Sequence, residues 1–238
     1  MNELNDNCYV LQVIDFIFQL RYCFYRSFIG GDEELGYSYI KRGMDIFLSL
    51  IGLLMLSPVI LLISMLIKFD NPKTTIFFKQ QRVGKNGNSF LIYKFRTMHQ
   101  NAENILMENK NLYKKYLKNN YKLEQNEDPR ITDVGLWLRK TSMDEIPQLI
   151  NVLKGEMSLV GPRPVVPEEL EEYKSKKNEF LSVKPGMTGY WQVCGRSNVG
   201  YPERVDLELY YVRRKSLMFD LLIILKTIPS VLKKDGAL

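Results

Sequence analysis

IFLSLIGLLMLSPVILLISMLI, residues Ile46 to Ile67, is an uncharged run of 22 residues. A helix needs about 20 apolar residues to cross the hydrocarbon core of a bilayer, so this run predicts a membrane helix. It starts too far along the chain for a secretory signal peptide, and no small-residue cleavage site follows it. The run therefore predicts that the chain is located at a membrane.

A serine-proline pair, Ser57-Pro58, stands in the middle of this run. Proline removes a backbone hydrogen bond and clashes with the preceding turn, so a kink or a full reversal is expected there. Basic residues on both sides of the run favour the cytosol for both ends, which a re-entrant helix would satisfy. An ordinary kinked spanning helix remains the alternative, since proline is common in such helices. The basic residues are Lys41, Arg42, Lys68, Lys73 and Lys79.

The segment before this helix is rich in aromatic residues but interrupted by charges. Residues 9–29, YVLQVIDFIFQLRYCFYRSFI, suit a helix that lies at the level of the lipid headgroups. A helix packed on the protein itself would show the same composition. Gly30-Gly31 then marks a polar hinge before the main apolar run.

The remainder of the chain predicts an α+β fold that is mainly helical with one small β-hairpin. TTIFFKQQRVGKNGNSFLIYKFRTM contains two strand-like runs around Lys85-Asn86-Gly87, where Asn-Gly supplies the positive φ angles of a tight turn. Residues 216–233 are strongly apolar and could lie against the membrane or in the core. Further helical patterns cover residues 100–125, 144–154, 167–180 and 202–212.

Composition limits the chemistry that the chain can carry. The formal charge of +6 suits an anionic partner, but the basic excess forms no concentrated stripe, and we expect no nucleic-acid binding. Three cysteines lie far apart, and His99 is the single histidine, so neither a zinc site nor a multi-histidine metal site is predicted. A catalytic acid, base or nucleophile is therefore expected to be a carboxylate.

Two adjacent carboxylates, Asp144 and Glu145, stand in the segment TSMDEIPQL. Pro147 is comfortable only in the first turn of a helix, which makes Asp144 a candidate N-cap. The same position favours an ionised carboxylate and an incoming phosphate, because the free N–H groups and the helix dipole attract both. Capping and catalysis both remain open from these residues alone.

Cations and rigid turns stand near this pair in the sequence. They are Arg139, the GPRP segment Gly161–Pro164, and KFR at Lys94–Arg96. Arginine offers a planar fork of donors that fits phosphate, although isolated arginines are more often solvated or structural. The segment KPGMTGYWQV, residues 184–193, could support a nucleobase or turn a corner.

Taken together, these motifs resemble the bacterial sugar transferase family, the monotopic phosphoglycosyl transferases that begin polysaccharide synthesis. The resemblance runs from about Lys41 to the C-terminus. Its carriers are KRGMDIFLSLIGLLMLSPVILL, FFKQQRVGKNGNSFLIYKFRTM, DPRITDVGLWLRKTSMDEIPQLINVLKGEMSLVGPRPVVPEE and VKPGMTGYWQVCGRSNVGYPERVDLELYYV. The resemblance implies a re-entrant helix broken at Ser57-Pro58.

The resemblance also implies a reaction. Asp144 would attack the β-phosphate of a UDP-sugar, release UMP and carry the sugar phosphate until undecaprenyl phosphate takes it off. Glu145 would bind Mg²⁺, an ion that accepts carboxylates together with substrate phosphates. Asp206 and Tyr210, in RVDLELYY, are similar to a family motif near the active site, although a helical face that points into the protein would explain them almost as well. Residues assigned to the substrate are Lys94, Arg96, Arg139, Pro162, Arg163, Pro164, Asp206 and Tyr210.

Three parts and a location follow from the resemblance. We expect an N-terminal interfacial segment at 1–39, the re-entrant membrane helix at 40–70 and a cytosolic catalytic domain at 71–238. The protein would lie on the cytosolic face of the bacterial inner membrane, in contact with membrane lipids, and a homo-oligomer stays open. The sugar is expected to be galactose or glucose, with galactose preferred, for exopolysaccharide, capsule or O-antigen. A membrane phosphohydrolase with the same aspartyl chemistry and a non-enzymatic membrane scaffold remain the alternatives.

Overall fold

A computed structural model of the chain describes residues 33–118, 123, 126–195 and 198–232. The helix expected at residues 9–29 lies outside these residues. The α-helices are α2 (Glu33–Asp70), α3 (Ala102–Glu108), α4 (Lys110–Lys118), α5 (Asp133–Lys140), α6 (Gln148–Lys154), α7 (Lys177–Phe180), α8 (Tyr190–Cys194), α9 (Glu203–Arg214) and α10 (Leu217–Leu232). The 3₁₀ helices are η1 (Lys85–Gly87), η2 (Met143–Glu145) and η3 (Glu169–Lys176), and the strands are β1 (Phe77–Val83), β2 (Ser89–Phe95), β3 (Ser158–Val160) and β4 (Gly186–Thr188).

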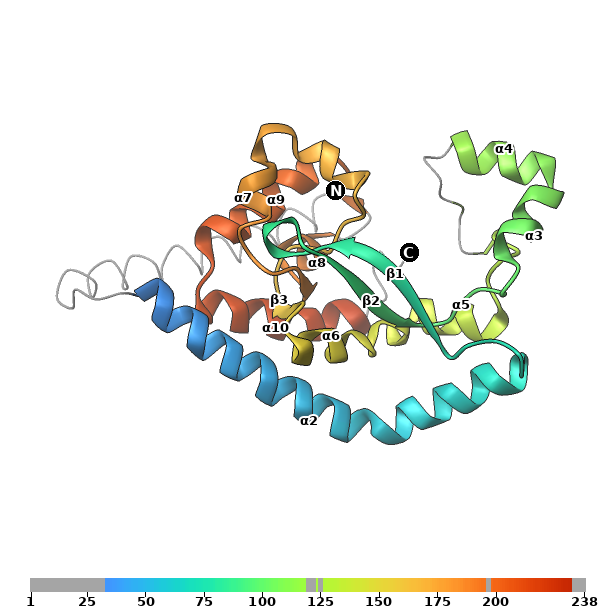
Figure 1. Cartoon of the computed structure of the whole chain (residues 1–238), viewed down its shortest axis with the longest axis horizontal. Coiled ribbons are helices and arrows are strands. Elements are labelled where there is room, and N and C mark those ends of the chain that lie inside the picture. The colour runs from blue at the N-terminus through green and yellow to red at the C-terminus, as the bar shows by residue number, and fades with distance from the viewer. Residues whose placement is uncertain (1–32, 119–122, 124–125, 196–197, 233–238) are drawn as a thin grey trace.

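The predicted membrane segment forms one continuous helix of 38 residues, α2, which passes through Pro58, so the break expected at Ser57-Pro58 is not found in it. Figure 1 shows α2 as a bowed helix along one side of the molecule, with α6 and α10 on its inner side. Proline has no N–H to donate to Leu54, four residues earlier. The hydroxyl of Ser57 donates to the Leu54 carbonyl instead, at 2.8 Å. This replacement explains how a helix in an apolar environment can tolerate Pro58.

Most of the apolar surface of α2 is not covered by the protein. The helix is long and apolar enough to cross a membrane, and only 11% of its most apolar part is buried inside the molecule. A core helix of a soluble protein would be mostly buried, so this exposure fits a helix in lipid. The helix already begins at Glu33, before the expected start at residue 40. Its most exposed apolar side chains are Tyr39, Phe47, Leu54, Met55 and Phe69.

The predicted β-hairpin is confirmed. Strands β1 and β2 pair antiparallel, from Phe77 opposite Phe95 to Val83 opposite Ser89. The turn between them has φ of 59° at Asn86 and 80° at Gly87. Two successive positive φ angles are what an Asn-Gly turn supplies.

A second sheet, which the sequence did not predict, consists of the parallel strands β3 and β4. The backbone that follows β3 is hydrogen-bonded to β4: Gly161 N donates to Thr188 O at 2.9 Å, and Gly186 N donates to Pro162 O at 2.8 Å. A Cβ added to Gly161 would lie 2.5 Å from Lys184 O. The glycines therefore permit close backbone packing, which favours a structural role for the 184–193 segment over a nucleobase platform.

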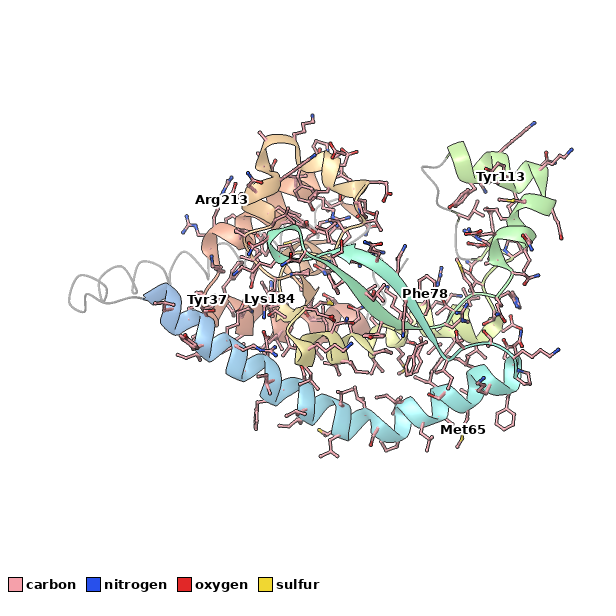
Figure 2. The ribbon with its side chains drawn as sticks, in the orientation of Figure 1. Tyr37, Met65, Phe78, Tyr113, Lys184 and Arg213 are labelled. Atoms are coloured by element: carbon pink, nitrogen blue, oxygen red, sulfur yellow. The ribbon has the colours of Figure 1, made fainter. Side chains whose placement is uncertain are left out.

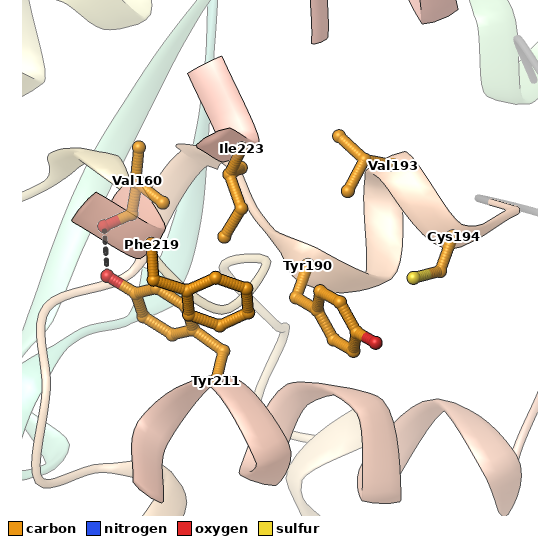
Figure 3. Close-up of a cluster of buried hydrophobic side chains, with 7 residues drawn as sticks. All are labelled: Val160, Tyr190, Val193, Cys194, Tyr211, Phe219 and Ile223. Carbon is orange, nitrogen blue, oxygen red and sulfur yellow. Dashed lines mark hydrogen bonds between the residues drawn. The ribbon is translucent and has the colours of Figure 1, made fainter. Parts of the chain in front are cut away.

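One core cluster joins β3, α8, α9 and α10 (Figure 3). Phe219 and Ile223 of α10 are fully buried there, and Tyr211 OH donates to Val160 O at 3.1 Å. The other side of α10 exposes apolar side chains at helical spacing, among them Leu221 and Leu225. The two alternatives for residues 216–233 therefore each describe a different face of this helix: one face packs in the core, and the other is exposed and could lie against the membrane.

The polar stretch around residues 100–118 forms α3 and α4, which stand apart from the main body (Figure 1). Figure 2 places Tyr113 of α4 in this lobe, far from Lys184 and Tyr37. A hollow there, lined by Ile105 and Pro129, contains none of the predicted site residues. The insertion is thus peripheral to the predicted chemistry.

Candidate active site

The carboxylate pair lies in a tight turn between α5 and α6. Ser142 precedes it with φ of 56° and ψ of 16°, in the left-handed region, and Asp144 and Glu145 belong to the 3₁₀ helix η2. The following helix, α6, starts at Gln148, with Pro147 as its N-cap residue. The prediction that Asp144 caps a helix running from 144 to 154 is therefore wrong. Ser142 is the N-cap residue of η2, and Pro147, which has no N–H to donate, separates η2 from α6.

Asp144 is buried, with 8% of its surface exposed. The residues on either side of the pair, Met143 and Ile146, pack against a cluster that contains Ile63 of α2 and Leu138 of α5. Burial raises the pKa of the Asp144 carboxyl, while the positive charge of Lys94 opposes this shift. A carboxylate removed from water in this way is a stronger nucleophile than an exposed one, provided that it stays ionised.

Lys94 of β2 reaches both members of the pair. Its ammonium lies 2.7 Å from Glu145 Oε1 and 3.7 Å from Asp144 Oδ2. The two adjacent carboxylates share this cation, which offsets the cost of burying Asp144. The hairpin thus supplies a charged group to the active site.

Two arginines add positive charge near Asp144. The charges of Arg139 and Arg163 both lower the pKa of Asp144, less than Lys94 does. Arg139 Nε donates to Thr97 Oγ1 at 2.9 Å, which fixes the direction of this side chain. Burial lowers the pKa of Arg139, and the nearby Asp144 charge opposes this effect.

The GPRP loop, Gly161–Pro164, is held through its backbone. Arg163 N donates to Glu208 Oε1 at 3.2 Å, and Pro164 O accepts from Arg82 Nη1 at 3.1 Å. The Arg163 guanidinium lies 5.8 Å from the centre of the Trp191 ring. The loop therefore presents Arg163 with little freedom to move, as phosphate binding requires.

A buried carboxylate beside a lysine and two arginines suits attack on an electrophile that carries several negative charges. The family model for bacterial sugar transferases matches residues 36–234. This chain belongs to the bacterial sugar transferase family.

The names of similar proteins support this assignment. The sugar transferase is 44% identical over 201 residues to the exopolysaccharide production protein ExoY of Sinorhizobium fredii, which covers 83% of this chain and 87% of ExoY. It is 45% identical over 202 residues to undecaprenyl-phosphate galactose phosphotransferase of Salmonella typhimurium, with 84% of this chain and 42% of the relative covered. It is also 38% identical over 197 residues to UDP-glucose:undecaprenyl-phosphate glucose-1-phosphate transferase of Escherichia coli, covering 79% of this chain and 39% of the relative. The protein is thus a membrane-associated sugar-phosphate transferase.

Part of the site of this sugar transferase was missed by the sequence analysis. Glu208 is 1% exposed and accepts hydrogen bonds from Tyr173 OH and from Arg204 Nε, the latter at 3.2 Å. Arg204 in turn lies 4.4 Å from the centre of the Trp191 ring. The available signal in the sequence was the pair of opposite charges, Arg204 and Glu208, four residues apart on α9. The sequence pattern cannot show that this face of the helix is buried against other segments.

Three predicted substrate residues do not gather with the carboxylate pair. Arg96 Nη2 donates to Thr75 Oγ1 at 2.7 Å, at the start of the hairpin. Asp206 is exposed and pairs with Lys176 at 3.0 Å. Tyr210 stacks on Tyr190 with ring centres 5.0 Å apart, beside the core. These three residues remain predictions as substrate ligands. Those whose charges act on Asp144 are Lys94, Arg139 and Arg163, and Pro162 and Pro164 flank Arg163 in its loop.

Proposed function

We propose that this sugar transferase moves a hexose-1-phosphate from a UDP-hexose to undecaprenyl phosphate through a covalent aspartyl intermediate. The observation that carries the proposal is the buried Asp144, with Lys94 Nζ 3.7 Å from its Oδ2. The names of relatives support the two substrates, because the Salmonella and Escherichia relatives are both named for undecaprenyl phosphate and the Escherichia relative also for UDP-glucose. Synthesis of exopolysaccharide, capsule or O-antigen would begin with this step.

In the first half-reaction, an Asp144 oxygen forms a bond to the β-phosphorus of the UDP-hexose. The bond between that phosphorus and the oxygen bridging to the α-phosphorus breaks, and its electron pair leaves with UMP. The product is an acyl phosphate that links Asp144 to the hexose. No proton is needed on either side, since the attacking carboxylate and the leaving phosphate are both anions.

The cations around Asp144 make this attack feasible. A carboxylate and a diphosphate repel each other, and fixed positive charges reduce that repulsion most in a site with little water. Lys94 would move its ammonium between Asp144 and the incoming phosphates. Arg139 and Arg163 would hold the phosphate oxygens on the other sides.

We propose Mg²⁺ as the metal ion, with Glu145 as its main protein ligand. Among the described residues, no group of three or more His, Cys, Asp and Glu side chains could hold a metal. Mg²⁺ fits such a site, because it is commonly bound by one or two carboxylates together with substrate phosphates. The Lys94 ammonium lies 2.7 Å from Glu145 Oε1, so this carboxylate already pairs with a positive charge. When bound, the ion would neutralise charge on the diphosphate.

In the second half-reaction, an oxygen of the lipid phosphate attacks the phosphorus of the intermediate. The new P–O bond joins the hexose phosphate to the lipid, and the bond to Asp144 breaks, which regenerates the carboxylate. The lipid must reach the site from the bilayer. The apolar neighbours of the pair, Met143 and Ile146, pack in the same cluster as Val59 and Ile60, directly after Ser57-Pro58.

A re-entrant helix at the cytosolic face of the inner membrane is part of the proposal. Lys41 at one end of α2 and Lys68 at the other favour the same side of the membrane. The Ser57 hydroxyl satisfies the carbonyl that Pro58 leaves free, so the helix can bend there without an unpaired backbone group. Labelling of single cysteines introduced near both ends, from outside intact cells, tests the topology. Protection of both ends supports re-entry, whereas labelling of one end supports a spanning helix.

Galactose is the proposed hexose, with glucose second. The Salmonella relative, at 45% identity, is named for galactose, and the Escherichia relative, at 38%, for glucose. A relative from Aeromonas hydrophila is named for N-acetylgalactosamine, so the sugar varies among relatives. A panel of UDP-sugars is therefore needed in the test.

Intact mass measurement after incubation of the solubilised protein with each UDP-sugar and Mg²⁺ tests the proposal. A hexose-phosphate adduct that disappears when undecaprenyl phosphate is added supports it. Adduct loss to water at the same rate, with free sugar phosphate released, would show a phosphohydrolase. The absence of any adduct with every sugar, together with polyanion binding that survives Asp144→Asn, would show a scaffold instead.

A further inference from the structure

The membrane helix α2 lies along the whole segment that carries the carboxylate pair. Arg42, near the start of α2, contacts the end of α6. Further along α2, a Cβ added to Gly52 would lie 3.3 Å from Leu149 Cδ1, near the start of α6. Ile63, further still, packs in the cluster that contains Ile146. The two segments are therefore antiparallel, and the carboxylate pair lies beside the second half of the membrane helix, near residues 59–67.

Arg42 makes the polar contact at one end of this arrangement. Its Nη1 donates to Val152 O at 2.6 Å and its Nη2 donates to Leu153 O at 2.7 Å. These carbonyls lie in the last turn of α6, where the helix dipole favours a cation, and Val152 O also accepts from Gly155 N at 3.0 Å. Gly155, with φ of 83°, ends the helix beside the same guanidinium. The two-pronged contact fixes α6 along the axis of α2.

The position of α6 along α2 decides where Asp144 stands. Only Ile146 and Pro147 separate η2, which carries the carboxylate pair, from the first residue of α6. A hydrogen-bonded helix of seven residues is stiff, so a shift at Val152 moves the turn by a similar amount. Since α2 is the segment in the membrane, the distance of Asp144 from the leaflet depends on this contact.

We propose that Arg42 is a positioning residue, which sets the height of Asp144 above the leaflet for the step in which the lipid phosphate takes the hexose phosphate. This inference rests on the proposed function and deepens it. Misplacement of reacting groups by about 1 Å can slow a reaction by about 100-fold. Arg42 would act through α6 without touching either substrate.

The two half-reactions should depend on Arg42 differently. The UDP-hexose arrives from water and would be held by residues of the catalytic part, Lys94, Arg139 and Arg163, which move together with Asp144. The height of the lipid phosphate is set by its tail in the bilayer, and the height of α2 is likewise set by the bilayer. A wrong height of Asp144 therefore affects only the attack of the lipid phosphate on the aspartyl intermediate.

Loss of Arg42 alone should not detach the catalytic part from α2. Asp45, one turn along and 2% exposed, accepts from Ser158 Oγ at 3.1 Å and from Leu159 N at 3.0 Å. Lys41 donates to Asp220 Oδ2 of α10 at 2.7 Å. These contacts keep α2 docked, so an Arg42 variant is expected to fold with α6 less firmly placed.

The test compares Arg42→Gln and Arg42→Lys in bilayer nanodiscs that contain undecaprenyl phosphate. Lys68→Gln is the matched control, because Lys68 also donates to two backbone carbonyls, Pro72 O at 3.0 Å and Thr74 O at 2.7 Å, but not in α6. Rapid quenching and intact mass follow adduct formation without lipid and adduct discharge with lipid. Each variant is measured in both half-reactions.

Arg42→Gln should form the adduct within about twofold of the unaltered rate and discharge it about tenfold more slowly. Arg42→Lys, which keeps one donor group, should discharge at an intermediate rate, and Lys68→Gln should match the unaltered protein in both steps. Equal slowing of both half-reactions in Arg42→Gln, unchanged discharge, or the same defect in Lys68→Gln would overturn the inference.

Failure of the proposed function would be visible separately, as the absence of an adduct in the unaltered protein. Amide hydrogen exchange of residues 143–153 then decides the inference. Faster exchange there in Arg42→Gln than in Lys68→Gln supports the positioning role, and equal exchange overturns it.

Discussion

Lys94 Nζ lies 3.7 Å from Asp144 Oδ2, and its charge opposes the rise that burial causes in the pKa of that carboxyl more than any other cation does. The relationship links the β-hairpin to the nucleophile. It also leads to a prediction about pH.

Lys94→Gln should move the acidic limb of activity to higher pH. Burial raises the pKa of Asp144 and Lys94 lowers it, so loss of the lysine raises that pKa further. Only the ionised carboxylate attacks phosphorus, and activity falls as the pH drops through its pKa. The fall should therefore begin at a higher pH in the variant. At neutral pH the rate of adduct formation should drop about 100-fold.

The control for Lys94 is Lys94→Arg, which keeps the charge and should keep the position of the acidic limb. The rate of adduct formation measured by intact mass from acid to alkaline pH compares the three proteins. An unshifted limb in Lys94→Gln would mean that Lys94 does not support the ionised nucleophile.

Asp144→Asn should abolish adduct formation and at the same time stabilise the fold at alkaline pH. Because the pKa of Asp144 is raised in the folded protein, its stabilising contribution is complete below the unfolded pKa of about 4 and is lost as the pH rises through the raised value. The amide does not ionise, so the variant should melt at a higher temperature than the unaltered protein at pH 8. That difference should shrink as the pH approaches about 4.

Asp206→Asn provides the comparison for this measurement, because Asp206 is exposed and pairs only at the surface with Lys176. Its melting temperature should follow that of the unaltered protein at both pH values. Equal stability of Asp144→Asn and the unaltered protein across the whole pH range would contradict a strained, buried carboxylate.

Ser142→Gly should stabilise the fold while slowing catalysis. Ser142 has a left-handed conformation, which costs a residue with a Cβ about 1–2 kcal/mol, and glycine avoids most of that cost at a smaller entropic penalty. The same freedom would loosen the turn that holds Asp144, so adduct formation should fall about tenfold. Urea unfolding and adduct kinetics measure the two effects.

Asn86→Gly is a matched change at another left-handed residue, in the hairpin turn outside the site. It should change stability little, because asparagine already tolerates this conformation, and it should leave the kinetics alone. If Ser142→Gly proves as active as Asn86→Gly, the strain at Ser142 has no part in catalysis.

Gly161→Ala should be strongly destabilising, by about 4 kcal/mol or more, because the added Cβ would meet the Lys184 carbonyl at 2.5 Å. Gly43→Ala in α2 meets nothing within 4 Å and should stabilise the helix by about 1 kcal/mol. Thermal unfolding in detergent compares the two. A mild effect of Gly161→Ala would show that the packing of β3 on β4 is loose.

The sequence by itself determined the parts of this protein that depend on neighbouring residues. An uncharged run long enough to cross the hydrocarbon core of a bilayer predicts a membrane helix, and Asn86-Gly87 make a tight turn through their own backbone preferences. The identity of Asp144 and Glu145 as the candidate pair also came from local composition, in a chain with one histidine. None of these inferences needed a distant contact.

Only the tertiary structure decided which distant groups meet. It brought Lys94, and not Arg96, to the carboxylate pair, and it placed Glu208 behind Arg163. It also divided the segment around Asp144 into a 3₁₀ turn and a helix, where local periodicity predicted a single helix. The physical reason is that burial and pairing of charges depend on segments far apart in the chain, whose approach no local pattern records.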